Sequence, residues 1–129
     1  MRITADKTLL DEALTEKVIG VFFEVYNELG YGFLESVYEN AMLKALRDAG
    51  LAVRAQQPIS VYFRGVVVGE YRADLVVEDR LILELKALAE IASIHEVQLV
   101  NYLKATRIPL GLILNFGPKP GFKRKIFTQ

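Results

Sequence analysis

The chain lacks cysteine and tryptophan, and it has one histidine among its 129 residues. Without cysteine it forms no disulfide and no thiolate zinc site, and it has no cysteine nucleophile. One histidine likewise excludes a metal site built from several histidines of a single chain. Any metal ion held by this chain must therefore be bound mostly by oxygen.

Long apolar runs are also absent. None approaches the roughly 20 residues that span a bilayer. The segment Met1 to Leu14 carries Asp6, Asp11 and Glu12, and it has no apolar centre of signal-peptide length. We therefore expect no membrane segment and a cytoplasmic location. The composition, 52% hydrophobic and 25% charged, fits one globular domain over residues 1–129.

An overall excess of charge is missing too, because 16 basic residues balance 16 acidic ones. This balance argues against strong non-specific nucleic-acid binding. The distribution is uneven, however: residues 104–129 hold six bases and no acid. A basic end can form a local phosphate-attracting surface, which makes Lys123 and Arg124 candidate nucleic-acid contacts. A solvated basic tail on a last strand explains the same charges.

The pattern of apolar residues predicts two helices, an antiparallel meander, a third helix and two last strands. The interior strand 110–116 follows the third helix as a crossover would, which favours parallel pairing with an earlier strand. We expect a mixed sheet of five or six strands, with a bend at Gly69. The predicted helices are 8–29 (or from 15), 35–49 and 94–105, and the predicted strands are 53–57, 59–63, 66–77, 81–88, 110–116 and 122–128.

Three charges lie inside runs that otherwise read as buried strands. Asp74 precedes an apolar run, and Glu84 and Lys86 alternate with leucines in the next run. Alternation along a strand places Glu84 and Lys86 on one face. A tight hairpin centred near Asp79 brings Asp74 opposite Glu84, where Cβ atoms lie about 5 Å apart.

Two carboxylates at that separation suit a hard divalent cation such as Mg²⁺, which takes oxygen ligands and keeps several waters. Lys86 points into the same space and is placed to hold a water or to stabilise charge on a phosphate. A half-exposed strand also alternates, so a solvated face is the other interpretation of Glu84 and Lys86.

Two helices carry further candidates. Glu35 and Tyr38 lie three residues apart on the second helix and share a face, although the pattern alone favours a helix-start glutamate and a core-edge tyrosine. On the third helix His95, Gln98 and Tyr102 form a polar row, which also fits the rim of a buried face. Ser93 and Glu96 are spaced as a capping box for that helix.

Together these motifs resemble known protein families. Asp74 followed by Glu84-Leu85-Lys86 resembles the signature of the PD-(D/E)XK nuclease superfamily. Gly32-Phe-Leu-Glu35-Ser-Val-Tyr38 resembles the motif of the GxxExxY family, a small bacterial and archaeal branch of that superfamily. The resemblance runs from about Leu14 to Phe127. It implies an α/β restriction-endonuclease-like core with a mixed sheet, an αβββαβ kernel, an extra N-terminal helix and a C-terminal strand.

The resemblance also implies a ligand set for Mg²⁺ or Mn²⁺. Asp74, Glu84 and the backbone carbonyl of Leu85 would bind one ion, and Glu35 would hold a second ion or a water. Lys86 would position the attacking water. The implied activity is a metal-dependent nuclease, which hydrolyses phosphodiester bonds of nucleic acid with metal-activated water.

The third helix would border that site. Gln98 and Tyr102 match a Gln-x-x-x-Tyr element of some superfamily nucleases, and they would contact a phosphate or stack on a base. His95 is either a phosphate contact or a helix-start residue.

Other activities fit the same residues. The fold is also compatible with a catalytically inactive module that binds nucleic acid or a protein partner, or with a hydrolase of small phosphate esters. An exposed edge at residues 53–63, or the last strand, offers a second copy a place to pair, so a homodimer is a further expectation.

Overall fold

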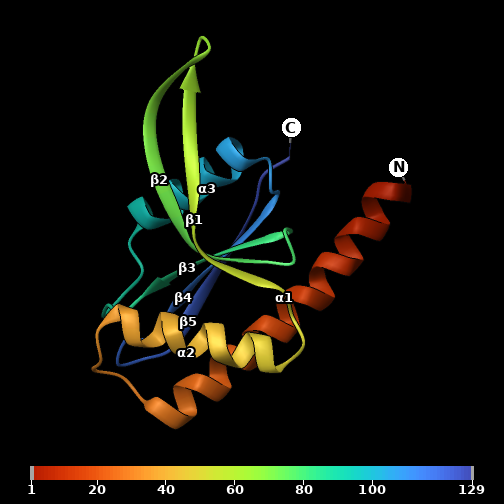
Figure 1. Ribbon diagram of the computed structural model, residues 1–129. Helices are drawn as coiled ribbons and strands as arrows, with labels where there is room; N and C mark the ends of the chain where they lie inside the picture. The colour runs from red at the N-terminus through yellow and green to blue at the C-terminus, as the bar shows by residue number, and fades with distance from the viewer. Residues whose placement is uncertain (1, 129) are drawn as a thin grey trace.

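The computed structural model describes the backbone of residues 2–128 and the side chains of residues 12–128. The element order α2-β1-β2-β3-α3-β4 is the predicted kernel, with α1 before it and β5 after it (Figure 1). Their bounds are α1 Arg2–Leu29, α2 Glu35–Asp48, β1 Val53–Phe63, β2 Val66–Val77, β3 Leu81–Lys86, α3 Ser93–Thr106, β4 Leu110–Asn115 and β5 Gly121–Ile126.

The five strands form one mixed sheet in the order β1-β2-β3-β4-β5. Only β3 and β4 are parallel, joined by the crossover through α3, which confirms the predicted pairing. The expected break at Pro58 is wrong, because β1 runs through it. A proline is accommodated there since β1 is an edge strand, where its missing N–H costs no ladder bond.

Strand β2 has the predicted bounds and an irregularity where a bend was expected. Val61 pairs with Gly69 and Tyr62 with Val67, so Val68 is an extra residue on β2. A bulge of this kind bends a strand and increases its twist. The β1–β2 hairpin consequently curves away as an arm beyond the other strands (Figure 1).

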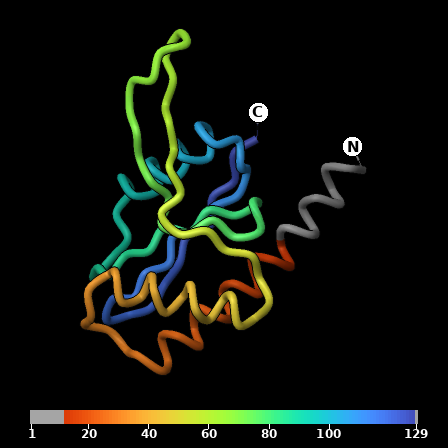
Figure 2. Tube along the Cα trace, viewed as in Figure 1, coloured from red at the N-terminus to blue at the C-terminus, as the bar shows by residue number. Residues whose placement is uncertain are grey.

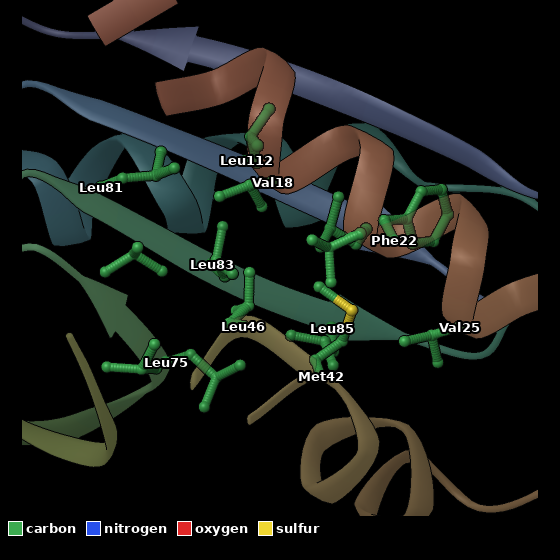
Figure 3. Close-up of a cluster of buried hydrophobic side chains, with 14 of the residues drawn as sticks. Val18, Phe22, Val25, Met42, Leu46, Leu75, Leu81, Leu83, Leu85 and Leu112 are labelled. Carbon is green, nitrogen blue, oxygen red and sulfur yellow. The ribbon is translucent and has the colours of Figure 1, made fainter. Parts of the chain in front are cut away.

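Helices α1 and α2 cover one face of the sheet, at the end away from the hairpin tip (Figure 2). Apolar positions of α1 recur every three or four residues and meet the leucines of β3, as Figure 3 shows for Val18 and Phe22. Helix α1 begins at Arg2, earlier than either predicted start. This apolar core contains Leu14, Val18, Val21, Phe22, Val25, Tyr38, Met42, Leu46, Val53, Leu75, Val77, Leu81, Leu83, Leu85, Leu110, Leu112, Leu114 and Phe116.

Helix α3 packs on the opposite face and forms a second, smaller core with Ile82 and Ile113. Close packing there depends on Gly111, since a Cβ at that position would lie 2.8 Å from a methyl carbon of Leu99. Within the residues described, no helix is long and apolar enough to cross a membrane.

Candidate active site at the strand fork

The site lies where the hydrogen-bonded ladder between β2 and β3 ends. Their ladder has three residue pairs and ends at Leu75 and Leu83, which leaves Asp74 opposite Glu84 as predicted. In place of ladder bonds, the backbone N–H of Asp74 donates to Oε2 of Glu84 over 3.1 Å, and the N–H of Leu85 donates to Oδ2 of Asp74 over 2.8 Å. Each carboxylate therefore binds the backbone of the other strand, which fixes the pair in place.

Burial makes this pair electrostatically unfavourable. Glu84 is 7% exposed, and burial, followed by the charge of Asp74, raises its pKa to about 8. Burial also raises the pKa of Asp74, against the opposing effects of the Leu85 N–H and Lys86. Neither carboxylate is in an ion pair among the described side chains. A bound cation would stabilise both charged forms, so the donor chemistry fits a divalent metal.

Lys86 lies on the α3 face of β3 with Glu84, and it lowers the pKa of both carboxyl groups. Its backbone carbonyl accepts from the N–H of Phe116 over 2.7 Å. Two residues further on, the Asn115 amide bonds both the N–H and the carbonyl of Leu88, each over 2.9 Å. Although β3 ends at Lys86 rather than at residue 88, Asn115 continues its pairing and holds the lysine segment firmly.

Two further side chains join the pair, and the sequence did not reveal them. Glu39 has a pKa raised by burial and by the charges of Asp74 and Glu35. Gln56 donates to both carboxylate oxygens of Glu39 over 2.9 Å, and it also opposes the burial that raises the pKa of Asp74. Gln56 thereby connects helix α2 to β2. The available signal for Glu39 was its position four residues after Glu35, on the same helix face.

The GxxExxY segment divides into two roles. Glu35 is exposed and interacts with Glu39, so it lies outside the carboxylate pair itself. Tyr38 is fully buried, where it donates to the carbonyl of Gly30 over 2.7 Å and accepts from the N–H of Phe33 over 3.2 Å. Its ring stacks on Phe116 at 4.4 Å. Tyr38 therefore fixes the turn between α1 and α2 instead of facing the site.

Helix α3 contributes Tyr102 to the site. Burial, followed by the charge of Glu84, raises the pKa of its hydroxyl, and its ring lies 5.7 Å from that of Tyr71. Gln98 lies beside Tyr102 in a cleft of about 840 Å³ between α3 and the β1–β2 hairpin. Tyr102 thus borders the carboxylates on one side and this cleft on the other, whereas Gln98 lines the cleft.

His95 serves the start of α3. Its Nδ1 accepts from the N–H of Ala92 over 3.0 Å, and Ala92 is the N-cap. The predicted capping box of Ser93 and Glu96 is wrong by one residue. Glu96 instead forms an ion pair with Lys125 at 2.6 Å.

The basic run on β5 is split between the two faces of the sheet. Arg124 pairs with Leu112, whose side chain belongs to the α1 core, so Arg124 lies on the face of the sheet opposite Glu84, and its predicted nucleic-acid contact stays a prediction. Lys123 pairs with Ile113 on the α3 face. Together with the hydrogen bond from Lys125, its charge lowers the pKa of Glu96. Strand alternation separates neighbours of a run, and neither residue joins the carboxylate pair.

Among the described residues, no group of three or more metal-ligating side chains is close enough to enclose an ion. The pair of Asp74 and Glu84 offers two oxygen ligands, with Glu39 nearby. Mg²⁺ is commonly bound by one or two carboxylates plus substrate phosphates and waters. An open, carboxylate-poor site of this kind suits a cation that completes its shell with substrate and water.

Comparison with known proteins agrees with this geometry. A family model described as PD-(D/E)XK nuclease superfamily matches residues 12–125. The crystal structure of SSO0001 has a similar fold, with a TM-score of 0.57 at 14% identity over 73% of this chain. This chain spans 50% of the length of that one. No curated protein matches.

Proposed function

Because the chain belongs to the PD-(D/E)XK nuclease superfamily, we propose that it is a metal-dependent nuclease that hydrolyses phosphodiester bonds of nucleic acid. The observation that carries the proposal is the buried pair of Asp74 and Glu84, bonded across two strands and in no ion pair among the described side chains, with Lys86 beside it. A surface pair of solvated charges would not be buried in this way.

Asp74, Glu84 and the backbone carbonyl of Leu85 form the proposed ligand set for Mg²⁺ or Mn²⁺. When bound, such an ion supplies Lewis-acid polarisation of the phosphate and a water that is more easily deprotonated. Glu39 takes the supporting role first expected of Glu35, because the charge of Asp74 adds to burial in raising the pKa of Glu39. Gln56 is the positioning residue that holds Glu39 and Asp74 together.

The other side chains act on the substrate. The Lys86 ammonium is placed to orient the attacking water and to stabilise negative charge that develops on the phosphate. Tyr102 borders the same space from α3 and Gln98 lies beside it in the cleft, and in this proposal their phenol hydroxyl and amide donate to phosphate oxygens. Together they hold the scissile phosphate over the carboxylate pair.

The test is hydrolysis of labelled single-stranded and duplex DNA and RNA with Mg²⁺ or Mn²⁺, and with EDTA. We expect Asp74→Ala, Glu84→Gln and Lys86→Ala each to lose at least about 100-fold in rate. Glu16→Gln, an exposed acid on α1, is the matched control and should retain full activity. Cleavage that persists in Asp74→Ala would contradict the assignment. Absence of cleavage with intact metal binding would favour an inactive binding module.

A further inference from the structure

The cleft beside the carboxylates has a composition unlike that of the whole chain. It is lined by 15 residues from the β1–β2 hairpin and α3, and none of them is acidic. Lys104 and Arg107 lie in its wall, together with Tyr62, Tyr71 and Tyr102. In a chain with as many acids as bases, a wall of this length without a carboxylate favours an anionic ligand with flat, stackable groups.

The cleft adjoins the proposed active site at Tyr102. Tyr102 lines it and is also close enough to Glu84 and Asp74 for their charges to raise its pKa. Tyr71 lies against Tyr102 with the two rings tilted by 44°. A ligand in the cleft would therefore pass the tyrosine pair and present a phosphate to the carboxylates.

On these grounds we propose that the cleft binds single-stranded nucleic acid and threads it between the hairpin and α3 toward Asp74 and Glu84. This inference rests on the proposed nuclease function and names its substrate class. Tyr62 and Tyr71, which are 65% and 48% exposed, offer rings on which unpaired bases stack. Lys104 and Arg107 contact the backbone phosphates.

The size and the small number of basic side chains in the cleft favour a single strand over a duplex. The cleft holds about 840 Å³, within the roughly 300–1,000 Å³ typical of small-ligand pockets. It is bounded by the hairpin on one side and α3 on the other, and bases reach its tyrosines only when they are unpaired. Duplex binding depends instead on many phosphate contacts from a broad basic surface, and two lysine or arginine side chains line this wall.

The experiment measures binding in EDTA, so that it does not depend on hydrolysis. Fluorescence anisotropy compares labelled single-stranded DNA and RNA with the matching duplexes at several salt concentrations. We expect at least one single strand to bind about tenfold or more tightly than either duplex. The DNA and RNA arms identify which sugar the cleft accepts.

Cleft variants outside the catalytic machinery test the location. Tyr62→Ala should weaken single-strand binding by about 5- to 100-fold through lost stacking, and Tyr62→Phe should restore it. Replacing Lys104 and Arg107 by glutamine should reduce the salt slope by about 1.4. Matched controls are Tyr31→Ala, which removes a tyrosine that is 61% exposed, and the pair Lys17→Gln with Lys44→Gln on the other helices.

Outcomes for the two proposals are distinct. Equal or tighter binding of duplex, or single-strand binding that is unchanged in the cleft variants, would overturn the single-strand inference even if hydrolysis is intact. Tight, cleft-dependent binding of a single strand without hydrolysis would support this inference and contradict the nuclease function alone. Circular dichroism of each variant verifies that the fold is retained.

Discussion

The two faces of strand β3 differ in what their side chains must do. On the α1 and α2 face Leu81, Leu83 and Leu85 are each at most 1% exposed and pack among apolar neighbours (Figure 3). On the α3 face the sequence changes from Ile82 to Glu84 and then to Lys86, while the burial of Glu84 remains nearly complete. One backbone thus carries a packed core on one face and buried charge on the other.

The two faces therefore differ in the energetic consequence of burial: burial of the leucines stabilises the fold, and burial of the carboxylate does not. Apolar burial contributes about 25 cal/mol per Å² of surface removed from water, whereas a buried carboxylate is costly unless it is paired or bound to a cation. Glu84 is buried at a position where an uncharged side chain would not carry this cost. Residues that cost stability at a fixed position are the ones expected to act on a ligand.

The largest loss of stability should come from placing a carboxylate on the face of β3 that packs against α1 and α2. Leu83→Glu places a carboxylate where the surrounding core is apolar, and we expect a loss of more than about 4–5 kcal/mol in the free energy of unfolding, or no folded protein at all. Leu83→Ala, which leaves only a cavity, should lose about 2–5 kcal/mol. Urea denaturation measures both. Equal, small losses would show that this face is not the tightly packed one.

Removal of the Glu84 charge from the α3 face should raise the free energy of unfolding, whereas a new charge on the other face lowers it. The pKa of Glu84 is about 8 in the folded protein against an ordinary 4.5, so the folded state binds more protons between those values. Stability of the metal-free protein therefore falls as pH rises from about 5 to 8.

Glu84→Gln removes that dependence. At pH 8 without metal it should unfold at higher urea than wild type, by on the order of 2–4 kcal/mol, with little difference at pH 5. Glu16→Gln serves as the control. A variant that is less stable than wild type at pH 8 would mean that ionised Glu84 has a compensating partner.

A smaller effect is expected at Tyr38. Tyr38→Phe removes the hydrogen bonds to Gly30 and Phe33, each worth about 1 kcal/mol. Stability should fall by about 2 kcal/mol while hydrolysis at 20 °C is unchanged, because the hydroxyl serves the turn between helices. Loss of activity in a fully folded variant would add Tyr38 to the catalytic group.

The smallest effect should be at Gln56. Gln56→Ala frees Glu39 from its bond and should weaken metal affinity by about tenfold, as is common for side chains that orient metal ligands. Stability should change little, since Gln56 is exposed. Affinity measured by Mn²⁺ titration checks this, and Gln57→Ala on the same strand is the control. An unchanged affinity would remove Glu39 and Gln56 from the site.

Local pattern was enough to predict the parts of the site that depend on one hairpin. The turn around Asp79 sets the register that places Asp74 opposite Glu84, and alternation sets the face of Lys86. The position of Glu39 beside the carboxylates depends on how α2 packs near the end of the β2–β3 ladder. No local sequence pattern encodes that packing. Gln56 has a left-handed φ of 52° inside a strand, a conformation that sequence propensity disfavours.

The basic run on β5 also shows what local sequence cannot predict, because residues that are adjacent in the chain lie on different faces of the sheet. Three consecutive bases read as one patch along the chain, but alternation sends Arg124 to the α1 face. The fold class, the kernel and the parallel pairing of β3 with β4 followed from periodicity and from the family resemblance. Contacts between elements far apart in sequence required the structure.

Asp74 and Glu84 form the proposed cation site, and calorimetric titration of metal ions can support or contradict this claim without relying on hydrolysis. Mg²⁺ and Mn²⁺ would be titrated at pH 8 into wild type, Glu84→Gln and Glu16→Gln, with and without a non-cleavable oligonucleotide. We predict binding to wild type and to Glu16→Gln, a loss of at least about tenfold in Glu84→Gln, and tighter binding as pH rises because the metal displaces a proton. Equal affinity in all three proteins, or equal absence of binding with oligonucleotide present, would contradict the claim.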